Sequence, residues 1–100
     1  MVNTILHNPH PGEILKIEFL DGYEMSQAKL ADYIGVSRSR INQIVSGKRS
    51  ITPDTDLRLC KFFGLSDGYF LRLQNIYDLM NTKIYMGDVI DAITPLNQAR

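Results

Sequence analysis

The sequence predicts an all-α fold, and two observations lead to this prediction. Residues that start and stop helices recur along the whole chain, and alternating β-branched runs bounded by hairpin turns are absent. A length of 100 residues suits one small domain with a single core. We therefore expect one all-α domain over residues 1–100.

The first three predicted helices are each bounded by residues that favour helix ends. Pro11 suits the first position of a helix, directly after a polar tail that ends at His10. Ser26 is placed to cap a second helix over 27–34, and Gly35 supplies the positive-φ stop. A third helix runs from 38 to about 46, with Ser37 as its cap and glycine at 47. The expected inner face of the first helix consists of Ile14, Leu15, Ile17 and Phe19.

Two further helices are predicted before the pattern weakens. Thr52, Pro53 and Asp54 start a fourth helix that stops at Gly64, and Ser66 is expected to cap a fifth. Beyond residue 81 the sequence is compatible with one helical turn or with an extended arm. The expected core residues are Leu57, Leu59, Cys60 and Phe63 in the fourth helix and a stripe of Tyr69, Leu73, Ile76, Tyr77 and Met80 in the fifth, with Phe70 and Leu71 off that stripe.

Charge is divided unevenly along a chain whose formal net charge is zero. Residues 29–61 contain seven basic and three acidic residues, a net of +4, and the rest of the chain carries a net of −4. We find neither a secretory signal nor an apolar run of about 20 residues, so we expect a cytoplasmic protein with no membrane contact. A single cysteine excludes a disulfide framework, and the helical, apolar setting of Cys60 favours a buried thiol.

The segment 26–46 has the spacing of a helix-turn-helix. Two short helices that cross steeply need a small residue at their contact, a left-handed residue in the turn, and an apolar seam that both helices share. Ala31 is the small residue at the contact, and Gly35 is the left-handed residue in the turn. The residues assigned to this framework are Leu30, Ala31, Ile34, Gly35, Val36, Ile41 and Ile44.

The outward face of the third helix is suited to the edges of DNA bases. With 100° per residue, Ile41, Ile44 and Val45 face inward, so that Ser39, Gln43 and Ser46 face outward. Arginine can bind guanine with two hydrogen bonds, and asparagine and glutamine suit adenine. We expect base contacts from Arg38, Ser39, Arg40, Asn42 and Gln43, and phosphate contacts from Gln27, Lys48 and Arg49.

Four segments together resemble the antitoxins of the HigA type, within the Xre-like, phage-repressor-like class of helix-turn-helix proteins. These are "HPGEIL" at 10–15, "MSQAKLADYIGVSRSRINQIVSGKRSIT" at 25–52, "LRLCKFFG" at 57–64 and "LQNIYDL" at 73–79. The resemblance implies a five-helix domain, a homodimer that represses its own operon on double-stranded DNA, and neutralisation of a small basic ribonuclease toxin. Two positions depart from the pattern: Asp56 stands where alanine is common, and Phe70 lies near a common tryptophan.

The alternatives are a stand-alone regulator without a toxin partner, and a metal protein or enzyme built on His7, His10 and Glu13. The latter segment has good structural uses at a helix start, and no nucleophile lies at a local spacing from a base. We therefore expect no catalysis, no metal and no cofactor. For dimerisation we expect residues 66–95, with Phe70, Leu71 and the apolar positions of 84–93 as interface candidates. A run of acids, Glu13, Glu18, Asp21 and Glu24, is the expected toxin-binding face.

Overall fold

The computed structural model describes residues 7–98, and it contains helices and turns but no strand within that range. The all-α prediction is therefore confirmed. Of the polar tail that was expected to end at His10, residues 1–6 lie outside the described residues. The elements are α2 (Pro11–Ile14), a π-helical segment η1 (Leu15–Leu20), α3 (Gln27–Ile34), α4 (Arg38–Val45), α5 (Pro53–Phe63), α6 (Tyr69–Tyr85), α7 (Gly87–Asp91) and the 3-10 turn η2 (Leu96–Gln98).

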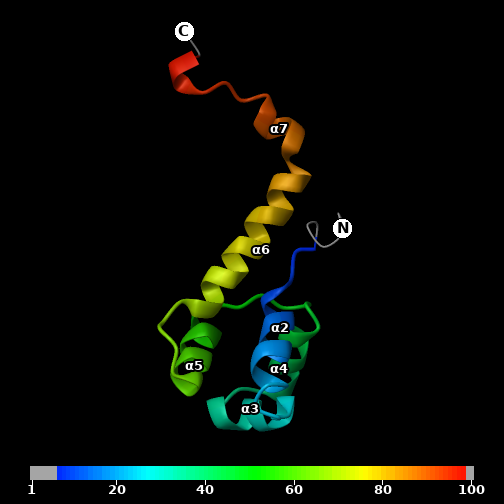
Figure 1. Cartoon of the computed structure of the whole chain (residues 1–100), viewed down its shortest axis with the longest axis vertical. Helices are drawn as coiled ribbons and strands as arrows, with labels where there is room; N and C mark the ends of the chain where they lie inside the picture. The colour runs from blue at the N-terminus through cyan, green and yellow to red at the C-terminus, as the bar shows by residue number, and fades with distance from the viewer. Residues whose placement is uncertain (1–6, 99–100) are drawn as a thin grey trace.

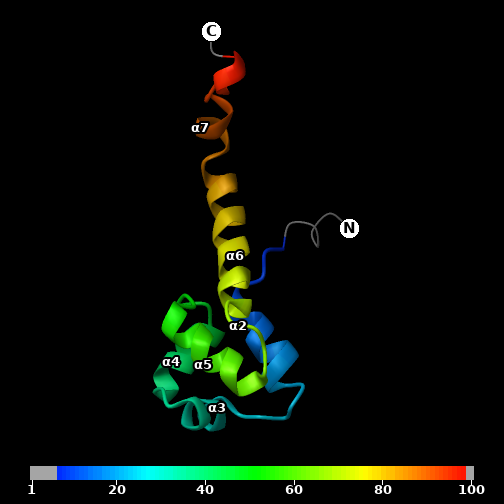
Figure 2. The same ribbon diagram turned by 90° about the vertical axis from the view of Figure 1, so that its left-hand side faces the viewer.

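The chain is arranged as a compact body from which one long helix leaves (Figures 1 and 2). Helices α2 to α5 cluster together, whereas α6 extends away from them and carries α7 and the C-terminal end at its tip. We call residues 78–98 the arm. The radius of gyration is 17.0 Å, against about 13 Å for a compact domain of 100 residues, and the arm accounts for this difference. No helix within residues 7–98 is both long and apolar enough to cross a membrane.

The core lies where α2, η1, α3, α4, α5 and the start of α6 meet. Leu15, Leu30, Ile41, Ile44 and Leu59 are completely buried there. Aromatic rings extend the core towards α6, because Phe19 of η1 packs against Phe63, Tyr69 and Phe70 with ring centroids 4.8–5.9 Å apart. This single core holds all the helices of the body in fixed relative positions.

The helix ends follow the local signals closely. The hydroxyls of Ser26 and Ser37 accept hydrogen bonds from the backbone N–H groups of Lys29 and Arg40, at 3.1 and 3.0 Å. Gly35 ends α3 in the left-handed conformation with φ 74°. At that φ any L side chain is strained, so glycine fits the tight turn between α3 and α4.

Several expectations about the core and about the start of the fifth helix were wrong. Ile17 and Leu57 are 60% and 51% exposed, so they do not belong to it. Phe70 is completely buried, and therefore it is not an interface candidate. The fifth helix starts at Tyr69 after Gly68 and has no cap from Ser66. Its first N–H groups bind Asp56 of α5 instead, and Phe70 and Gln74 are its buried residues, while Tyr69 and Leu73 of the expected stripe are partly buried against the core.

The chain after residue 81 is helical rather than extended. Helix α6 continues to Tyr85, and α7 forms a short second segment that includes Val89 and Ile90. Ile76 and Met80, which were expected in the core, are 58% and 46% exposed because α6 has by then left the body. The arm therefore presents apolar side chains that the body does not cover.

Candidate nucleic-acid interface

Helix α4 is presented at the surface by an apolar seam that it shares with α3. Ile41 and Ile44 of α4 and Leu30 and Ala31 of α3 are fully buried between the two helices. Val36, in the turn, packs against the same cluster. Because one side of α4 is held in this seam, the opposite side is fixed in orientation and faces solvent.

The outward side of α4 carries polar side chains that are free to reach a ligand. Arg38, Ser39, Asn42 and Gln43 are all exposed. The guanidinium of Arg38 forms an exposed ion pair of 3.1 Å with Asp32 of α3, which is weak in water and can be exchanged for another anion. This side of α4 can donate and accept hydrogen bonds without disturbing the core.

Residues expected to read bases lie directly beside residues expected to hold phosphates. The amide of Asn42 donates to the Gln27 side-chain oxygen at 3.4 Å, and the Arg49 guanidinium donates to the Gln43 side-chain oxygen at 3.2 Å. Lys48 is exposed in the loop after α4. The start of α3, the outward side of α4 and the following loop thus form one continuous polar surface.

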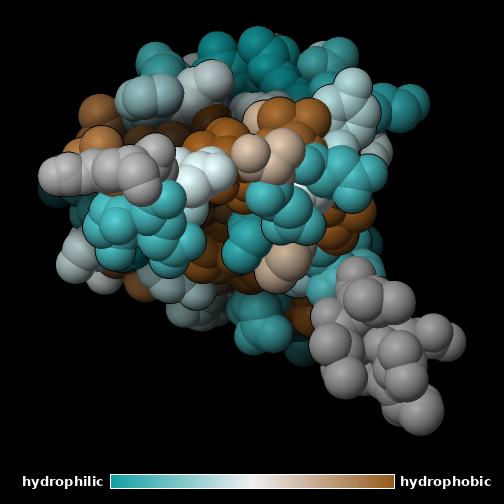
Figure 3. Space-filling model, turned by 90° about the horizontal axis from the view of Figure 1, so that it is seen from above, coloured by the Kyte–Doolittle hydropathy of each residue, from teal (hydrophilic) through white to brown (hydrophobic). Residues whose placement is uncertain are grey.

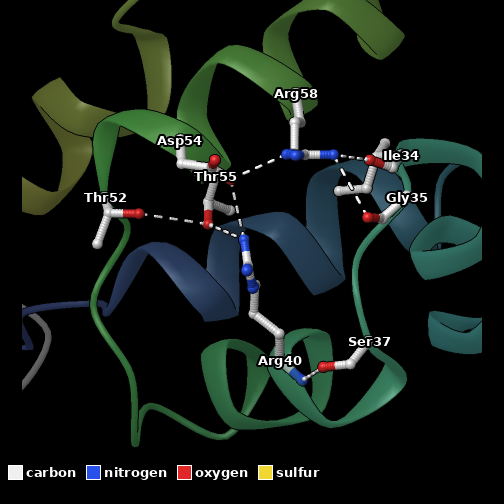
Figure 4. A network of polar contacts seen from close by, with 8 residues as sticks. All are labelled: Ile34, Gly35, Ser37, Arg40, Thr52, Asp54, Thr55 and Arg58. Carbon is white, nitrogen blue, oxygen red and sulfur yellow. Dashed lines mark hydrogen bonds and ion pairs between the residues drawn. The ribbon is translucent and has the colours of Figure 1, made fainter.

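Arg40 does not lie on this surface, although it was expected to contact bases. Its guanidinium donates to the carboxylate of Asp54 at 3.0 Å and to the Thr55 hydroxyl at 3.4 Å, and its side chain is only 28% exposed (Figure 4). Arg40 directly precedes the buried Ile41, so the helical rotation carries its side chain towards α5. The structure therefore separates Arg40 from Asn42 and Gln43.

Asp54 joins Arg40 to a second arginine. The Arg58 Nε donates to Asp54 at 2.9 Å, while its Nη1 donates to the carbonyl oxygens of Ile34 and Gly35 at 2.8 and 3.3 Å (Figure 4). Hydrogen bonds from Arg58 and then Arg40 lower the pKa of the Asp54 carboxyl below its ordinary value. This clamp ties α4 and the α3–α4 turn to the start of α5, and sequence periodicity gave no signal for it.

The first helix supports α4 from behind through a close backbone approach. A Cβ atom placed on Gly12 of α2 would lie 1.8 Å from the carbonyl oxygen of Ile44 and 2.9 Å from the Cα of Val45. Only glycine lets the two helices come this close. The sequence analysis noted the segment "HPGEIL" but missed this contact, because the distance between residues 12 and 44 is not readable from local spacing.

His10 caps the helix that carries Gly12. Its Nδ1 accepts the Gly12 N–H at 2.9 Å, its ring meets the edge of Tyr77 with centroids 4.9 Å apart, and the residue is only 6% exposed. Burial lowers the pKa of His10, and the opposing effects of Asp78 and Glu13 are smaller. The neutral imidazole is therefore favoured, as an Nδ1 acceptor requires.

His7, His10 and Glu13, which were considered as metal ligands, make other contacts in the structure. His7 pairs with Glu13 at 3.1 Å on the surface, and His10 is occupied as a helix cap. Within the part of the chain that the structure describes, no group of three histidine, cysteine or carboxylate side chains could hold a metal ion. Burial also raises the pKa of the Cys60 thiol, which favours its protonated form.

Comparison with known proteins identifies the fold of this surface. The helix-turn-helix family HTH_3 matches residues 17–70. Virulence-associated protein I of Dichelobacter nodosus is 49% identical over 70 residues, which cover 70% of this chain and 65% of that protein, slightly under two thirds. Among solved structures, the Pseudomonas aeruginosa antitoxin HigA with the higBA promoter is similar at 37% identity and a TM-score of 0.85, covering 90% of this chain and 99% of that chain. A HigA-family antidote protein from Coxiella burnetii is 40% identical with a TM-score of 0.84, at the same coverages of 90% and 99%.

Proposed function

The chain belongs to the helix-turn-helix family HTH_3, whose members bind DNA and are not enzymes, and from this membership we propose that it represses its own operon and acts as the antitoxin of a ribonuclease toxin. It resembles HigA antitoxins over nine tenths of its length. The observation that carries the proposal is the continuous polar surface of α4, in which base-reading and phosphate-binding side chains are neighbours.

In the proposed complex α4 enters the major groove of operator DNA. Arg38, Ser39, Asn42 and Gln43 contact base edges, and Gln27, Lys48 and Arg49 hold phosphates on either side. All of these side chains are exposed except that of the half-buried Gln27, which supports this division. Arg40 takes a different part: by pairing with Asp54 it fixes the angle of α4, so that it acts on the DNA through the helix and not through a base.

A second copy of the chain is the proposed partner for the arm. Isolated helices shorter than about 12–15 residues are marginal in water. The part of α6 that lies in the arm, residues 78–85, and the short helix α7 therefore need a surface to pack on. Figure 3, which looks along the long axis of the molecule, shows hydrophobic side chains between the polar ones. The exposed apolar residues of α6 and beyond are Ile76, Leu79, Met80, Ile84, Tyr85, Val89, Ile90, Ile93 and Leu96. Paired arms would place two α4 helices on half-sites about one DNA turn, roughly 34–36 Å, apart.

The toxin is proposed to bind the acidic surface of α2, η1 and the turn that follows at residues 21–24. Glu13, Glu18, Asp21 and Glu24 oppose a single lysine there, giving residues 13–24 a net charge of −3. Beside them a cavity of about 200 Å³ is lined by Pro9, Ile14 and Ile17 among other residues. An apolar centre with a charged rim is typical of protein interfaces, and a ribonuclease that binds RNA is basic and therefore complementary.

Co-purification from the native operon, followed by footprinting on its promoter, tests the proposal. We expect a small basic protein to copurify and a protected region with two related half-sites. Light scattering should give a dimer for the wild type and a monomer for Ile84→Glu, which places a charge in the arm. Protection of DNA without a copurifying toxin would identify the chain as a stand-alone regulator, and the absence of protection would contradict the DNA-binding surface itself.

A further inference from the structure

The start of α6 is capped by a side chain from another helix. The Asp56 carboxylate of α5 accepts the N–H groups of Gly68 at 2.7 Å, Phe70 at 2.9 Å and Leu71 at 3.1 Å. Gly68, the residue at the N-cap position, has no side chain that could do this. Asp56 is 1% exposed, so the three bonds are shielded from water. A buried charge with three donors at a helix N-terminus makes a strong, directional attachment.

A second buried polar contact holds α6 one turn further along. The side-chain oxygen of Gln74 accepts the N–H of Ile51 at 2.8 Å, and its nitrogen donates to Asp78 at 3.0 Å. Gln74 is 5% exposed, and Ile51 belongs to the loop that follows α4. On another side of α6, Asn8 donates to the carbonyl oxygen of Tyr77 at 3.0 Å. These contacts restrict both the position and the tilt of α6 on the body.

We propose that Asp56 is a positioning residue that determines the spacing of the half-sites which the protein selects. This inference rests on the proposed dimer, in which the arms join two DNA-reading bodies. A rigid connection between the body and α6 holds the second body at one distance and one rotation along the DNA. A loose connection lets the second body occupy several distances and rotations. Since Asp56 joins α5, which is clamped to α4, to the first turn of α6, it controls that connection directly.

The test measures selectivity for spacing in a graded series at position 56. Wild type, Asp56→Asn and Asp56→Ala are titrated by fluorescence anisotropy against synthetic duplexes that carry the two footprinted half-sites, moved closer or farther apart by one or two base pairs. A duplex with one half-site measures each body alone. Asparagine keeps one acceptor oxygen and alanine keeps none. Leu20→Ala, which shortens a buried side chain of η1 outside the helix-turn-helix segment 26–46, is the control for a general loss of stability.

We expect the wild type to prefer one spacing by about tenfold over its neighbours, Asp56→Ala by less than about threefold, and Asp56→Asn to lie between them. Affinity for a single half-site should be the same in all of them, and Leu20→Ala should keep the wild-type preference. Amide exchange should be faster at Gly68, Phe70 and Leu71 in both variants, and if the alanine variant does not fold, the asparagine variant provides the comparison. Equal selectivity in wild type and variants would overturn the inference. A wild type that binds only single half-sites would instead contradict the proposed dimer on which it rests.

Discussion

Gly12→Ala separates two opposing effects of a methyl group inside a helix. At an exposed position of a helix, alanine is more stabilising than glycine by about 1 kcal/mol, so from local propensity alone the variant should be more stable. The structure predicts the reverse. The new Cβ would lie 1.8 Å from the carbonyl oxygen of Ile44, whereas ordinary contacts begin at 3.4 Å, so α2 and α4 must separate by roughly 1.6 Å. The atom it meets is backbone and cannot rotate away.

The expected loss is at the upper end of what overpacking costs, about 3 kcal/mol. For a domain of this size it lowers Tm by at least about 12 °C. Urea and thermal denaturation, followed by circular dichroism, measure this loss. Gly87→Ala is the matched control, since nothing lies within 4 Å of a Cβ at that position, and it should change stability by less than about 1 kcal/mol. A Gly12→Ala variant as stable as the wild type would refute the reasoning from close packing.

Because α2 packs closely against the end of α4, the folded fraction of the variant should also bind operator DNA more weakly.

Three other predictions follow from the charged and polar residues. Gln43→Ala should lose about 1–3 kcal/mol of binding free energy on the operator and relax the preference for particular bases. Lys48→Ala should lower the affinity for all DNA sequences alike and reduce the salt slope of binding by about one. Equal effects on cognate and random DNA for both variants would contradict the division into base-reading and phosphate-binding residues. The pKa of His10 is lowered in the folded state, so as pH falls the unfolded chain binds a proton at a higher pH than the folded chain does. Stability should therefore fall as pH drops below the ordinary value of 6.5. In denaturation measured as a function of pH, His10→Asn should remove this dependence. Reversal of Glu18 and Asp21 to lysine should slow association with the proposed toxin in stopped-flow measurements at low salt, and an unchanged rate would place the proposed contact elsewhere.

The parts of the fold that depend on local chemistry could be predicted from the sequence. Ser26 and Ser37 accept the hydrogen bonds that a cap makes, and Gly35 and Gly64 have the positive φ that ends a helix. The burial of Ile41 and Ile44 follows from helical spacing. In each case the residues that decide the outcome lie within about one turn of each other.

The contacts that could not be predicted join residues far apart in the sequence. Phe70 was placed outside the core because the periodicity of α6 favoured another stripe, yet the inward face is fixed by Asp56, 14 residues earlier. Arg40 was expected to contact a base because arginine can bind guanine with two hydrogen bonds, and the ion pair of its guanidinium with Asp54 of α5, at 3.0 Å, could not be anticipated. Propensity and period describe only neighbours along the chain, so they carry no information about partners that come from another helix.

The uncovered apolar side of the arm has a consequence for dosage. With assembly through the arm as proposed, a chain on its own must hold these side chains in water, and only the paired form presents two α4 helices to one operator. At concentrations where most chains are single, the number of pairs follows the square of the chain concentration, so halving the protein leaves about a quarter of the pairs that can bind an operator. Repression would then respond to the amount of protein more steeply than a single-chain reader could, and loss of the protein would release its promoter abruptly.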